Sequence, residues 1–341
     1  MKKAMTSFDI AVAVRELQSL LPGSRISNIY QIDEKTFLLK LRKPGLETGQ
    51  INLLFEAGTR LHLTNYSLEK PKKPPDFAMA LRKHLRNGII KSIKQHNFER
   101  IVVLEVNRKN ETYKLIIELF GDGNVILVSP EDKILHALKY RRMRDRNIIR
   151  NERFSFPPPS GLDPRFLRRE DLDVLKEYGT LPIVKALTRL LSIGGLDSEE
   201  ILKRCGILKN KACNLLSSSE LDAIFSAIKN YLRDIEEEMK PVIYCNSDGE
   251  FIDCSPVPLM LYSGINRIEF KSFNEALDEF YTLRKAQANL NAAVRERRSE
   301  IERLERILDQ QNKTLEDLKR KYDVNKKRGD LIYVHLHELH S

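Results

Sequence analysis

The chain has few of the residues that mark small metal-binding or disulfide-stabilised proteins. Among 341 residues there are four cysteines and no tryptophan. The cysteines form no C-x-x-C pair, so neither a zinc ribbon nor a redox motif is predicted. Cys245 and Cys254 flank an expected hairpin, and a disulfide between them is one interpretation. Buried free thiols in a reducing cytosol are the favoured one.

Long apolar runs are also missing. No stretch approaches the roughly 20 uncharged apolar residues that cross a bilayer. The first 22 residues include Asp9 and Glu16 and contain no apolar block of the signal-peptide kind. We therefore expect a cytoplasmic protein that has no membrane partner.

The motifs of common enzyme classes are absent as well. The sequence has no Gly-rich phosphate loop followed by Lys-Ser, no H-E-x-x-H and no G-x-S-x-G. We therefore expect a binding protein without enzymatic activity, cofactor or metal. His335, His337 and His340 are weak metal candidates, because residues two apart do not share a helix face.

What the chain does have is locally concentrated positive charge. Lysine and arginine outnumber aspartate and glutamate by 58 to 48. Arg60 to Arg100 holds ten basic and three acidic residues, and Lys139 to Arg153 holds seven basic and two acidic ones. The combined excess of basic over acidic residues in these two segments is larger than the excess of the whole chain. Such clustering favours a polyanionic partner, although a merely solvated charged surface is the common alternative.

The basic segments supply candidate contacts to a nucleic-acid backbone. RNA is the expected partner, with His84 or Tyr140 as candidates to stack on an exposed base. We expect the two segments to converge on one face. The candidate backbone contacts are Arg82, Lys83, His84, Arg86, Lys91, Lys94, Arg141, Arg142, Arg144 and Arg146.

Residues 1–156 have the pattern of an α+β domain. Short segments rich in β-branched and aromatic residues, separated by turn signals, predict a largely antiparallel set of strands. They lie at 25–30, 36–41, 51–55, 60–63, 101–106, 113–119 and 124–128. Helical spacing predicts one helix that begins at Thr6 or Ser7 and ends at Pro22-Gly23, and a second that carries Phe77, Leu81, Leu85 and Ile89.

Three prolines at 157–159 predict a domain boundary, and residues 157–240 have helical periodicity. Leu190 to Leu196 joins two short helices through a glycine turn. The turn is similar to a helix-hairpin-helix, whose amides can hold a phosphate, and a tight turn inside a helical bundle explains it equally well. Residues 241–272 predict a β-hairpin that returns to the first domain and joins its sheet.

Residues 273–341 carry the clearest periodic signal. Steps of three and four from Phe273 to Tyr322 meet apolar residues at twelve of fifteen positions. Such a pattern predicts a coiled-coil arm of roughly 75 Å at about 1.5 Å per residue. A coiled coil needs a partner helix, which we expect from a C-terminal part of the same protein beyond residue 341.

Three further residues have both structural and functional interpretations. Asp9 falls in the first turn of its helix, where a carboxylate complements the helix dipole. Glu99 and Arg100 stand at the head of a strand. They form either a local ion pair, which the pattern favours, or contacts to a base edge and a phosphate.

Several motifs together resemble the N-terminal module of the NFACT family, which includes NEMF and RqcH. The order and spacing agree, and the resemblance covers essentially all 341 residues. The matching segments are Phe8-Asp9-Ile10, Arg25-Ile26-Ser27-Asn28-Ile29-Tyr30, Phe77-Ala78-Met79, Leu81-Arg82-Lys83-His84-Leu85, Phe98-Glu99-Arg100-Ile101, Ile117-Glu118-Leu119, Pro256-Val257-Pro258-Leu259 and the run from Phe273 to Tyr281.

The resemblance implies a ribosome quality-control factor. Such a protein binds the large ribosomal subunit with stalled peptidyl-tRNA and recruits charged tRNA for template-free tailing of the nascent chain. It also implies a fold like that of the formamidopyrimidine-DNA glycosylases, followed by helix-hairpin-helix elements. Asp9, Glu99 and Arg100 match the family's tRNA-binding and tailing positions, although the family has aspartate where this chain has Glu99.

Residues 118–124 are more similar to archaeal and eukaryotic members than to bacterial ones, which favours an archaeal source. Two other functions compete with this interpretation. A DNA glycosylase or lyase would need a nucleophilic amine at a flipped base, and the start Met1-Lys2-Lys3 lacks the proline and glutamate of those enzymes. A coiled-coil adhesin or scaffold would explain the arm and leave the basic clusters without a role.

Overall fold

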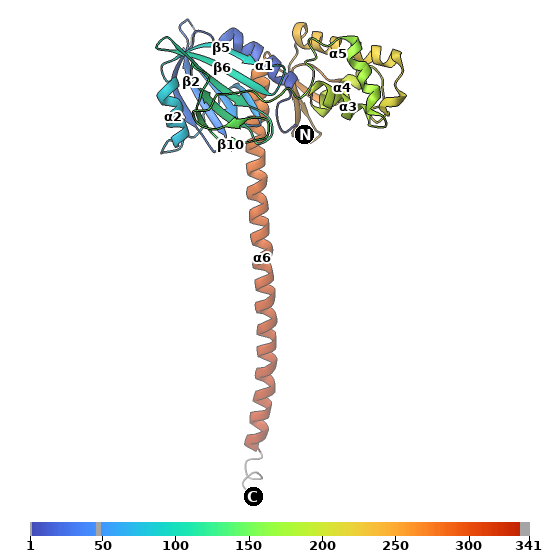
Figure 1. The fold of residues 1–341 in the computed structure, drawn as a ribbon. Helices are drawn as coiled ribbons and strands as arrows, with labels where there is room; N and C mark the ends of the chain where they lie inside the picture. Colours follow the sequence, from blue (N-terminus) through green and yellow to red (C-terminus); the bar gives the residue numbers. More distant parts are fainter. Residues whose placement is uncertain (1, 46–48, 335–341) are drawn as a thin grey trace. The chain divides into compact units, whose positions relative to one another are not determined.

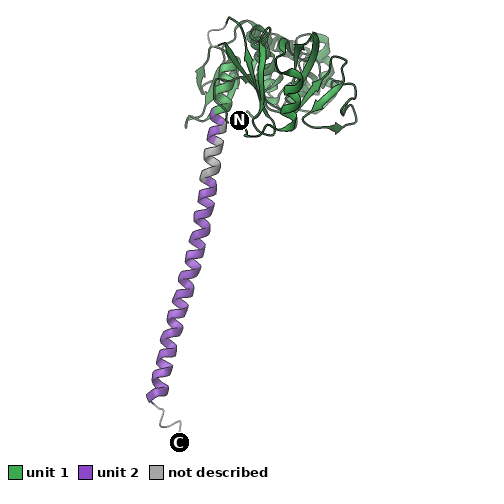
Figure 2. Ribbon diagram, turned by 90° about the vertical axis from the view of Figure 1, so that its left-hand side faces the viewer, with its two compact units in different colours: residues 1–282 green, residues 283–341 purple. Residues whose placement is uncertain are grey.

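The computed structural model describes residues 2–45 and 49–334 of the chain. Two compact units are present, Met1–Thr282 and Leu283–Ser341 (Figure 2). The histidines considered as metal ligands, at 335, 337 and 340, lie outside the described residues. No helix in the described part is both long and apolar enough to cross a membrane.

A nine-stranded antiparallel sheet dominates the first unit (Figure 1). Its strand order is β4-β3-β2-β1-β5-β6-β7-β8-β9. The strands are β1 (Arg25–Gln31), β2 (Thr36–Arg42), β3 (Gln50–Glu56), β4 (Arg60–Leu63), β5 (Ile89–Gln95), β6 (Ile101–Arg108), β7 (Glu111–Glu118), β8 (Asn124–Val128) and β9 (Ile134–Ala137). The seven strands predicted from sequence are confirmed, and so is the prediction of mixed α and β structure around an antiparallel sheet.

Two strands of this sheet, β5 and β9, were not predicted, and β5 was missed because the second helix is shorter than its apolar spacing indicates. Helix α2 (Asp76–Leu85) ends before Ile89, which begins β5. Asn87 has a φ of 66°, and a Cβ on Gly88 would lie 2.5 Å from a methyl group of Val106. The chain therefore turns sharply at Asn87-Gly88 and enters the sheet, so the prediction that the helix includes Ile89 is wrong.

The sheet curls until two of its turns meet. The N–H of Gly58, between β3 and β4, donates to the carbonyl of Glu118 at 2.9 Å. A Cβ on Gly123, between β7 and β8, would lie 2.1 Å from the carbonyl carbon of Ala57. Only glycine permits such an approach of one backbone to another. Helix α1 (Ser7–Leu20) packs against β5 and β4 on the inner, apolar side of the curled sheet.

A helical region continues the same apolar core. Phe8 of α1 contacts Phe98 in the β5–β6 turn and Tyr231 in helix α5 of the helical region. The ring centroids are 4.9 Å apart in both pairs. The two helices predicted around the glycine turn are confirmed as α3 and α4. The elements of this region are the 3-10 helices η1 (Arg169–Tyr178) and η2 (Cys213–Leu215), and α3 (Ile183–Leu191), α4 (Gly195–Arg204) and α5 (Ser218–Glu237).

The hairpin after α5 forms a sheet of its own. Strand β12 (Val242–Cys245) pairs with β13 (Phe251–Ser255) on one side and with β14 (Asn266–Glu269) on the other. The prediction that this hairpin joins the first sheet is therefore wrong. Both edges of the large sheet have other partners, since Leu63 of β4 donates to the Asn274 side chain and Ile134 of β9 donates to Glu152. All four cysteines are free thiols.

Several short elements complete the described chain. The two-stranded sheet β10–β11 follows β9, and the 3-10 helix η3 follows β13. A second, smaller apolar cluster on the other face of β6 to β9 is covered by Phe154 and Phe156. The bounds are β10 (Arg141–Arg142), β11 (Asn147–Ile148) and η3 (Met260–Tyr262).

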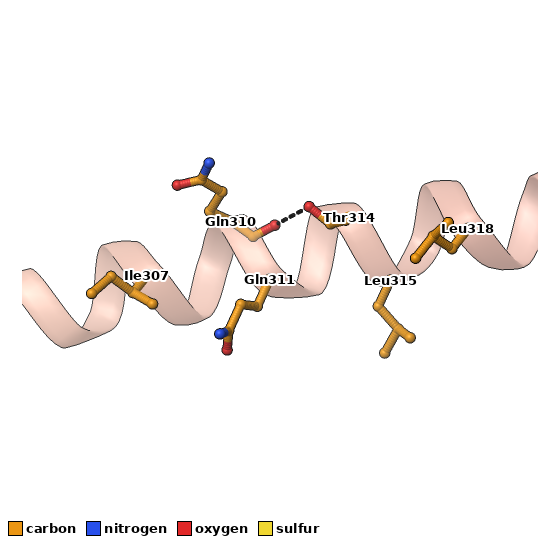
Figure 3. A pocket seen from close by; sticks show the side chains of 6 residues that line it. All are labelled: Ile307, Gln310, Gln311, Thr314, Leu315 and Leu318. Atoms are coloured by element: carbon orange, nitrogen blue, oxygen red, sulfur yellow. Dashed lines mark hydrogen bonds between the residues drawn. The ribbon is translucent and has the colours of Figure 1, made fainter.

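Helix α6 (Phe273–Val334) changes character along its length. Phe273 and Phe280 are fully buried in the first unit, where Glu16 accepts the N–H groups of Phe273 and Asn274 at 2.8 and 2.9 Å. In the second unit Ile307, Gln311 and Leu315 project from the same side of the helix (Figure 3). Leu315 is 51% exposed. The helix is confirmed at 62 residues, about 93 Å at about 1.5 Å per residue, whereas its pairing in a coiled coil stays a prediction.

Candidate functional site

A pocket of about 550 Å³ lies where the sheet meets the helical region. Five segments distant in sequence form its wall: the residues around the start of α1, the start of β6, Phe120 after β7, the proline-rich linker and the α3–α4 turn. Glu99 and Arg100 both line it, so the structure brings this predicted pair into a cavity. Thr6 and Ser160 face them from the neighbouring segments.

A strained turn places Glu99 and Arg100 at this pocket. Asn97 and Phe98, which precede them, have φ values of 44° and 57°. For a bulky residue such as Phe98 the left-handed conformation is a genuine outlier, and it persists only where packing enforces it. Phe98 is 3% exposed and packs edge-on against Phe8. Burial of this ring therefore fixes the direction in which the next two side chains leave the sheet.

Glu99 connects the sheet to the linker. Its carboxylate accepts the N–H of Ser160 at 2.8 Å and the hydroxyl of the same residue at 2.7 Å. That hydroxyl also contacts the hydroxyl of Ser192, which directly follows α3. Glu99 forms no ion pair with Arg100 among the described residues, so the favoured prediction of a local ion pair is wrong.

Arg100 carries a charge that the protein does not neutralise by direct contact. Within residues 2–45 and 49–334, its guanidinium has no hydrogen-bond acceptor and no ion-pair partner. Partial burial lowers the pKa of Arg100, and the charge of Glu99 opposes that shift. An arginine remains protonated in proteins regardless. The pocket wall therefore presents a cation whose donors are available to a ligand.

The start of α4 adds further donors to the same pocket. Its N-cap is Gly194, which has no side chain to bond the first amides. The N–H groups of Gly195 and Leu196 find no acceptor in the described part of the chain. Helix N-termini carry partial positive charge and favour anions. Together with Arg100 they form an arrangement suited to a phosphate or a carboxylate.

Asp9 lies beneath the pocket rather than in its wall. It is 2% exposed, and its carboxylate accepts the N–H of Thr6 at 2.7 Å and contacts the Lys2 ammonium at 2.8 Å. Lys2 also lies 3.3 Å from Asp253. Burial alone would lower the pKa of Lys2, but Asp253 and Asp9 raise it well above its ordinary value. A protonated, enclosed amine of this kind is a poor nucleophile, which disfavours a lyase reaction at Lys2.

A third buried carboxylate, Asp197 of α4, belongs to the same layer. Burial first, and then the charge of Asp9, raise its pKa to about 7. One oxygen accepts the hydroxyl of Tyr231 at 3.4 Å, and a hydrogen bond with the Thr6 side chain opposes the rise in pKa. The region below the pocket thus collects Asp9, Asp197 and Asp253 around the single ammonium of Lys2.

The predicted backbone contacts are only partly available to a ligand. Arg146 is buried in an ion pair with Glu118 at 2.6 Å, so its prediction as a phosphate contact is wrong. Arg141 pairs with Asp122 at 2.9 Å. Arg82 donates to the carbonyl of Ile29 and lies over the ring of Tyr30, which leaves it half-buried.

His84 is a poor cation at neutral pH. Burial, followed by the charges of His136 and Lys83, lowers its pKa below the ordinary value, and its ring packs against Tyr113 and His136. The remaining candidates are exposed, and none of them lines the pocket. They are Lys83, Arg86, Lys91, Lys94, Arg142 and Arg144.

The basic residues of the second segment do not all converge with α2. Arg141 lies near Lys139 and Lys35 around Asp122. Arg150 instead lies close enough to His84 to lower its pKa, and Arg146 is interior. Arg146 is therefore removed from any shared face, Arg150 is brought close to α2, and the convergence of the other basic residues stays a prediction.

Sequence reasoning missed Ser160 as part of the site, and it considered the amides of the glycine turn without placing them beside Arg100. Ser160 directly follows the three prolines that indicate a domain boundary, and no local pattern connects it to Glu99. The glycine turn was the only signal of an amide-rich helix start. Its closeness to Arg100 depends on how the helical region packs on the sheet.

Comparisons with known proteins agree with this architecture. Residues 6–341 match the NFACT N-terminal and middle domains. The chain is 37% identical to the archaeal Rqc2 homolog aRqcH of Methanocaldococcus jannaschii, across 98% of this chain and 50% of that protein. It is 28% identical to the ribosome quality control complex subunit NEMF of Mus musculus, across 98% of this chain and 33% of that protein.

A crystal structure of the fibrinogen binding protein from Staphylococcus aureus has a similar fold. The TM-score is 0.65 at 25% identity, and the match covers 81% of this chain and 98% of that one. The chain thus spans between a third and a half of the length of the two curated relatives above. With a family match over nearly all of its residues and 37% identity to the archaeal relative, the chain belongs to the NFACT family and is of the archaeal type.

Proposed function

We propose that this chain is the tRNA-binding part of a cytoplasmic ribosome quality-control factor. The factor binds the large ribosomal subunit that carries a stalled peptidyl-tRNA and recruits charged tRNA for template-free tailing of the nascent chain. Peptide bond formation stays with the ribosome, so the chain acts as an adaptor. The names of the curated relatives support the ribosomal role, and the pocket supports the contact with RNA.

One observation carries the proposal: Arg100, whose guanidinium has no partner among the described residues, lines the same pocket as Gly195, the first residue of α4, whose N–H is free in the described part of the chain. A phosphate of the tRNA backbone satisfies both sets of donors at once. In this role the α3–α4 turn acts as a helix-hairpin-helix, whose amides hold a phosphate without reading the base.

Glu99 and Asp9 act as positioning residues in this scheme. The carboxylate of Glu99 is already occupied by Ser160, so it holds the linker in place and leaves the RNA to Arg100. Asp9 is buried and caps the first turn of α1 together with Thr6. It fixes the segment before α1, which forms part of the pocket wall.

The apolar side of α6 in the second unit is proposed to pair with another helix of the same protein. Leu304, Leu308 and Leu315 are more than half exposed, although their spacing is that of a coiled-coil core. Unpaired leucines in such a row expose apolar surface to water, and a partner helix removes it.

The proposal is tested by tRNA binding to the Arg100→Gln variant. Loss of one charged hydrogen-bond donor costs about 1.5 to 3 kcal/mol, so we expect affinity to fall roughly 10- to 100-fold. The slope of log affinity against log salt should fall by about one. Fluorescence anisotropy with labelled tRNA measures both, and Arg100→Lys should recover part of the loss because it restores the charge.

Arg233→Gln is the matched control. Arg233 is exposed on α5, so this substitution removes the same charge at a position away from the pocket. It should bind tRNA like the parent. Sedimentation of the parent with large ribosomal subunits tests the ribosomal part of the proposal. Equal tRNA affinity of parent and Arg100→Gln would contradict the role of the pocket.

A further inference from the structure

A second basic hollow lies at the opposite end of β6. Its volume is about 430 Å³, and its wall contains four cations, three asparagines and one isoleucine, with no carboxylate. We call it the basic groove. Its cations are Arg25, Lys91, Arg108 and Lys109, and its other residues are Asn87, Ile89, Asn107 and Asn110.

Backbone irregularities project these cations from the sheet. The β6–β7 hairpin has the two-residue loop Lys109-Asn110, with φ values of 52° and 67°. Asparagine and glycine usually occupy such a turn, and lysine adopts it at a conformational cost. Lys91 is the extra residue of a bulge between Ile90 and Ser92, which interrupts its pairing with β6. Bulges of this kind redirect a side chain.

The charge of the groove is not neutralised by neighbouring acids. In the part of the chain that the structure describes, none of its four cations has an ion-pair partner. The guanidinium groups of Arg25 and Arg108 donate to the backbone carbonyls of Asn87 and Lys83, which orients them without cancelling their charge.

The two acidic side chains nearest in the strand register already have partners. Glu111, opposite Arg108 in the hairpin, accepts the hydroxyl of Tyr113 at 2.6 Å. Glu105, on the neighbouring strand, accepts the hydroxyl of Ser92 at 2.9 Å. Neither residue lines the groove. A ligand therefore meets cations and amides there.

We propose that the basic groove binds the sugar-phosphate backbone of a structured RNA, as a contact separate from the Arg100 pocket. Arg100 precedes β6 and Arg108 is its last residue, so eight residues at about 3.3 Å each separate the two sites by about 25 Å along the strand. One folded RNA can reach both. The choice of RNA as the polyanion rests on the proposed function, whereas the affinity of the groove for phosphate rests on its own residues.

The composition of the groove indicates contacts to the backbone and not to bases. Its lining has no aromatic ring on which a base could stack, and Ile89 is its one apolar residue. Arginine and lysine contact phosphate oxygens, and asparagine amides contact phosphate or 2′-hydroxyl groups. Recognition of this kind follows shape and charge, so the groove should bind RNA duplexes of unrelated sequence with similar affinity.

The test is a triple variant, Arg25→Gln/Lys91→Gln/Lys109→Asn, of the 341-residue chain. Arg108 is kept because it bonds the backbone of α2. The matched control, Lys176→Gln/Lys185→Gln/Lys203→Gln, removes three exposed charges from the helical region. The probes are a labelled RNA duplex of mixed sequence, labelled tRNA and purified large ribosomal subunits.

We expect the groove variant to bind the duplex at least about 10-fold more weakly than the parent, and its salt slope to fall by about two to three. The control should lose little. The tRNA and subunit arms show which RNA uses the groove in its folded context. Circular dichroism melting of parent and variants checks that the fold is kept.

The outcomes separate the two proposals. If Arg100→Gln weakens tRNA binding while the groove variant binds every RNA like the control, the groove proposal is overturned and the proposed function stands. If the groove variant loses RNA affinity and Arg100→Gln does not, the pocket is overturned and the groove stands. Tighter binding of the parent to an anionic peptide such as poly-glutamate than to the duplex would replace RNA with a protein partner.

Discussion

A turn with positive φ angles stands at each end of β6, but one turn holds a buried side chain and the other is exposed. Each end follows or precedes a turn in which two non-glycine residues have positive φ: Asn97-Phe98 before the strand and Lys109-Asn110 after it. At the first turn the strained residue is aromatic and buried against Phe8. At the second it is a lysine in an open basic groove.

The difference shows two uses of a strained turn. Burying Phe98 fixes Glu99 and Arg100 in an enclosed pocket, where a single cation acts with helix amides. The exposed Lys109 contributes positive charge to the basic groove, which is proposed to recognise RNA by its shape and charge. The enclosed end is therefore part of the folding core, and the open end contributes to binding with little effect on stability. Each variant below changes one end and leaves the other as its reference.

The largest expected effect is the loss of the Phe98 ring. Truncation of a buried phenylalanine costs about 3 to 5 kcal/mol of unfolding free energy, so Phe98→Ala should lower it by that amount. Alanine is left with the same positive φ, so the change reports packing and not strain. Ile89→Ala, at the open end, removes a side chain that is 42% exposed and should cost under about 1 kcal/mol. Urea denaturation measures both, and similar losses would remove the contrast.

The next effect concerns pH and is confined to the enclosed end. The pKa of Asp197 is about 7 in the folded protein against an ordinary 3.8, so the folded state holds this proton more tightly than the unfolded one. The stabilising contribution of the protonated form is present at low pH and is lost as pH rises from about 4 to 7. Between pH 5 and pH 8 the parent should therefore lose about 2 to 3 kcal/mol that Asp197→Asn does not lose.

Denaturation curves of parent and Asp197→Asn at both pH values test this directly. The difference between the two proteins isolates Asp197 from the histidines, which both contain. Parallel pH profiles would show that the carboxylate is ionised in the folded state throughout. No carboxylate and no histidine lines the groove at the open end, so its affinity for RNA should not change over the same range.

The smallest effect is the relief of strain at the open end. Asparagine adopts a positive φ more readily than lysine, so Lys109→Asn should stabilise the protein by about 0.5 to 1 kcal/mol while removing a phosphate contact. Lys94→Asn, on the neighbouring β5, removes the same charge from a regular strand and should be neutral or slightly destabilising. A thermal shift of both variants in the same direction would show that the turn at Lys109 is not strained.

Local patterns were sufficient for most elements of the fold. Alternation and turn residues located seven strands, because half-buried strands display their burial in sequence. They failed at β5, where Leu85 and Ile89 keep helical spacing although Asn87-Gly88 reverses the chain. They also placed β12 and β13 in the wrong sheet, since strand pairing depends on which edges are already occupied.

The candidate site was only partly predictable for the same reason. Motif likeness indicated Glu99 and Arg100, but the partner of Glu99 is Ser160, 61 residues later in the chain. Charge counting gave equal weight to Arg146, which is buried with Glu118, and to Lys91, which is exposed. Charge counting did not single out Arg25 or Lys109. Their place in the groove depends on the fold, which brings the turn at Asn87 and the turn at Lys109-Asn110 to the same hollow.

The ammonium of Lys2 has a consequence for how the protein is made. It bonds the carbonyl of Cys254, 252 residues away, so the beginning of the chain acquires its neighbours near the end of the first unit. At about 5 to 20 residues per second, a translating ribosome needs about 13 to 50 s to span that interval. For that period Lys2 has its neighbour Asp9, but Asp253 and the carbonyl of Cys254 are still to be made, and the acidic layer is incomplete. Completion of the first unit must therefore follow synthesis of its last strands.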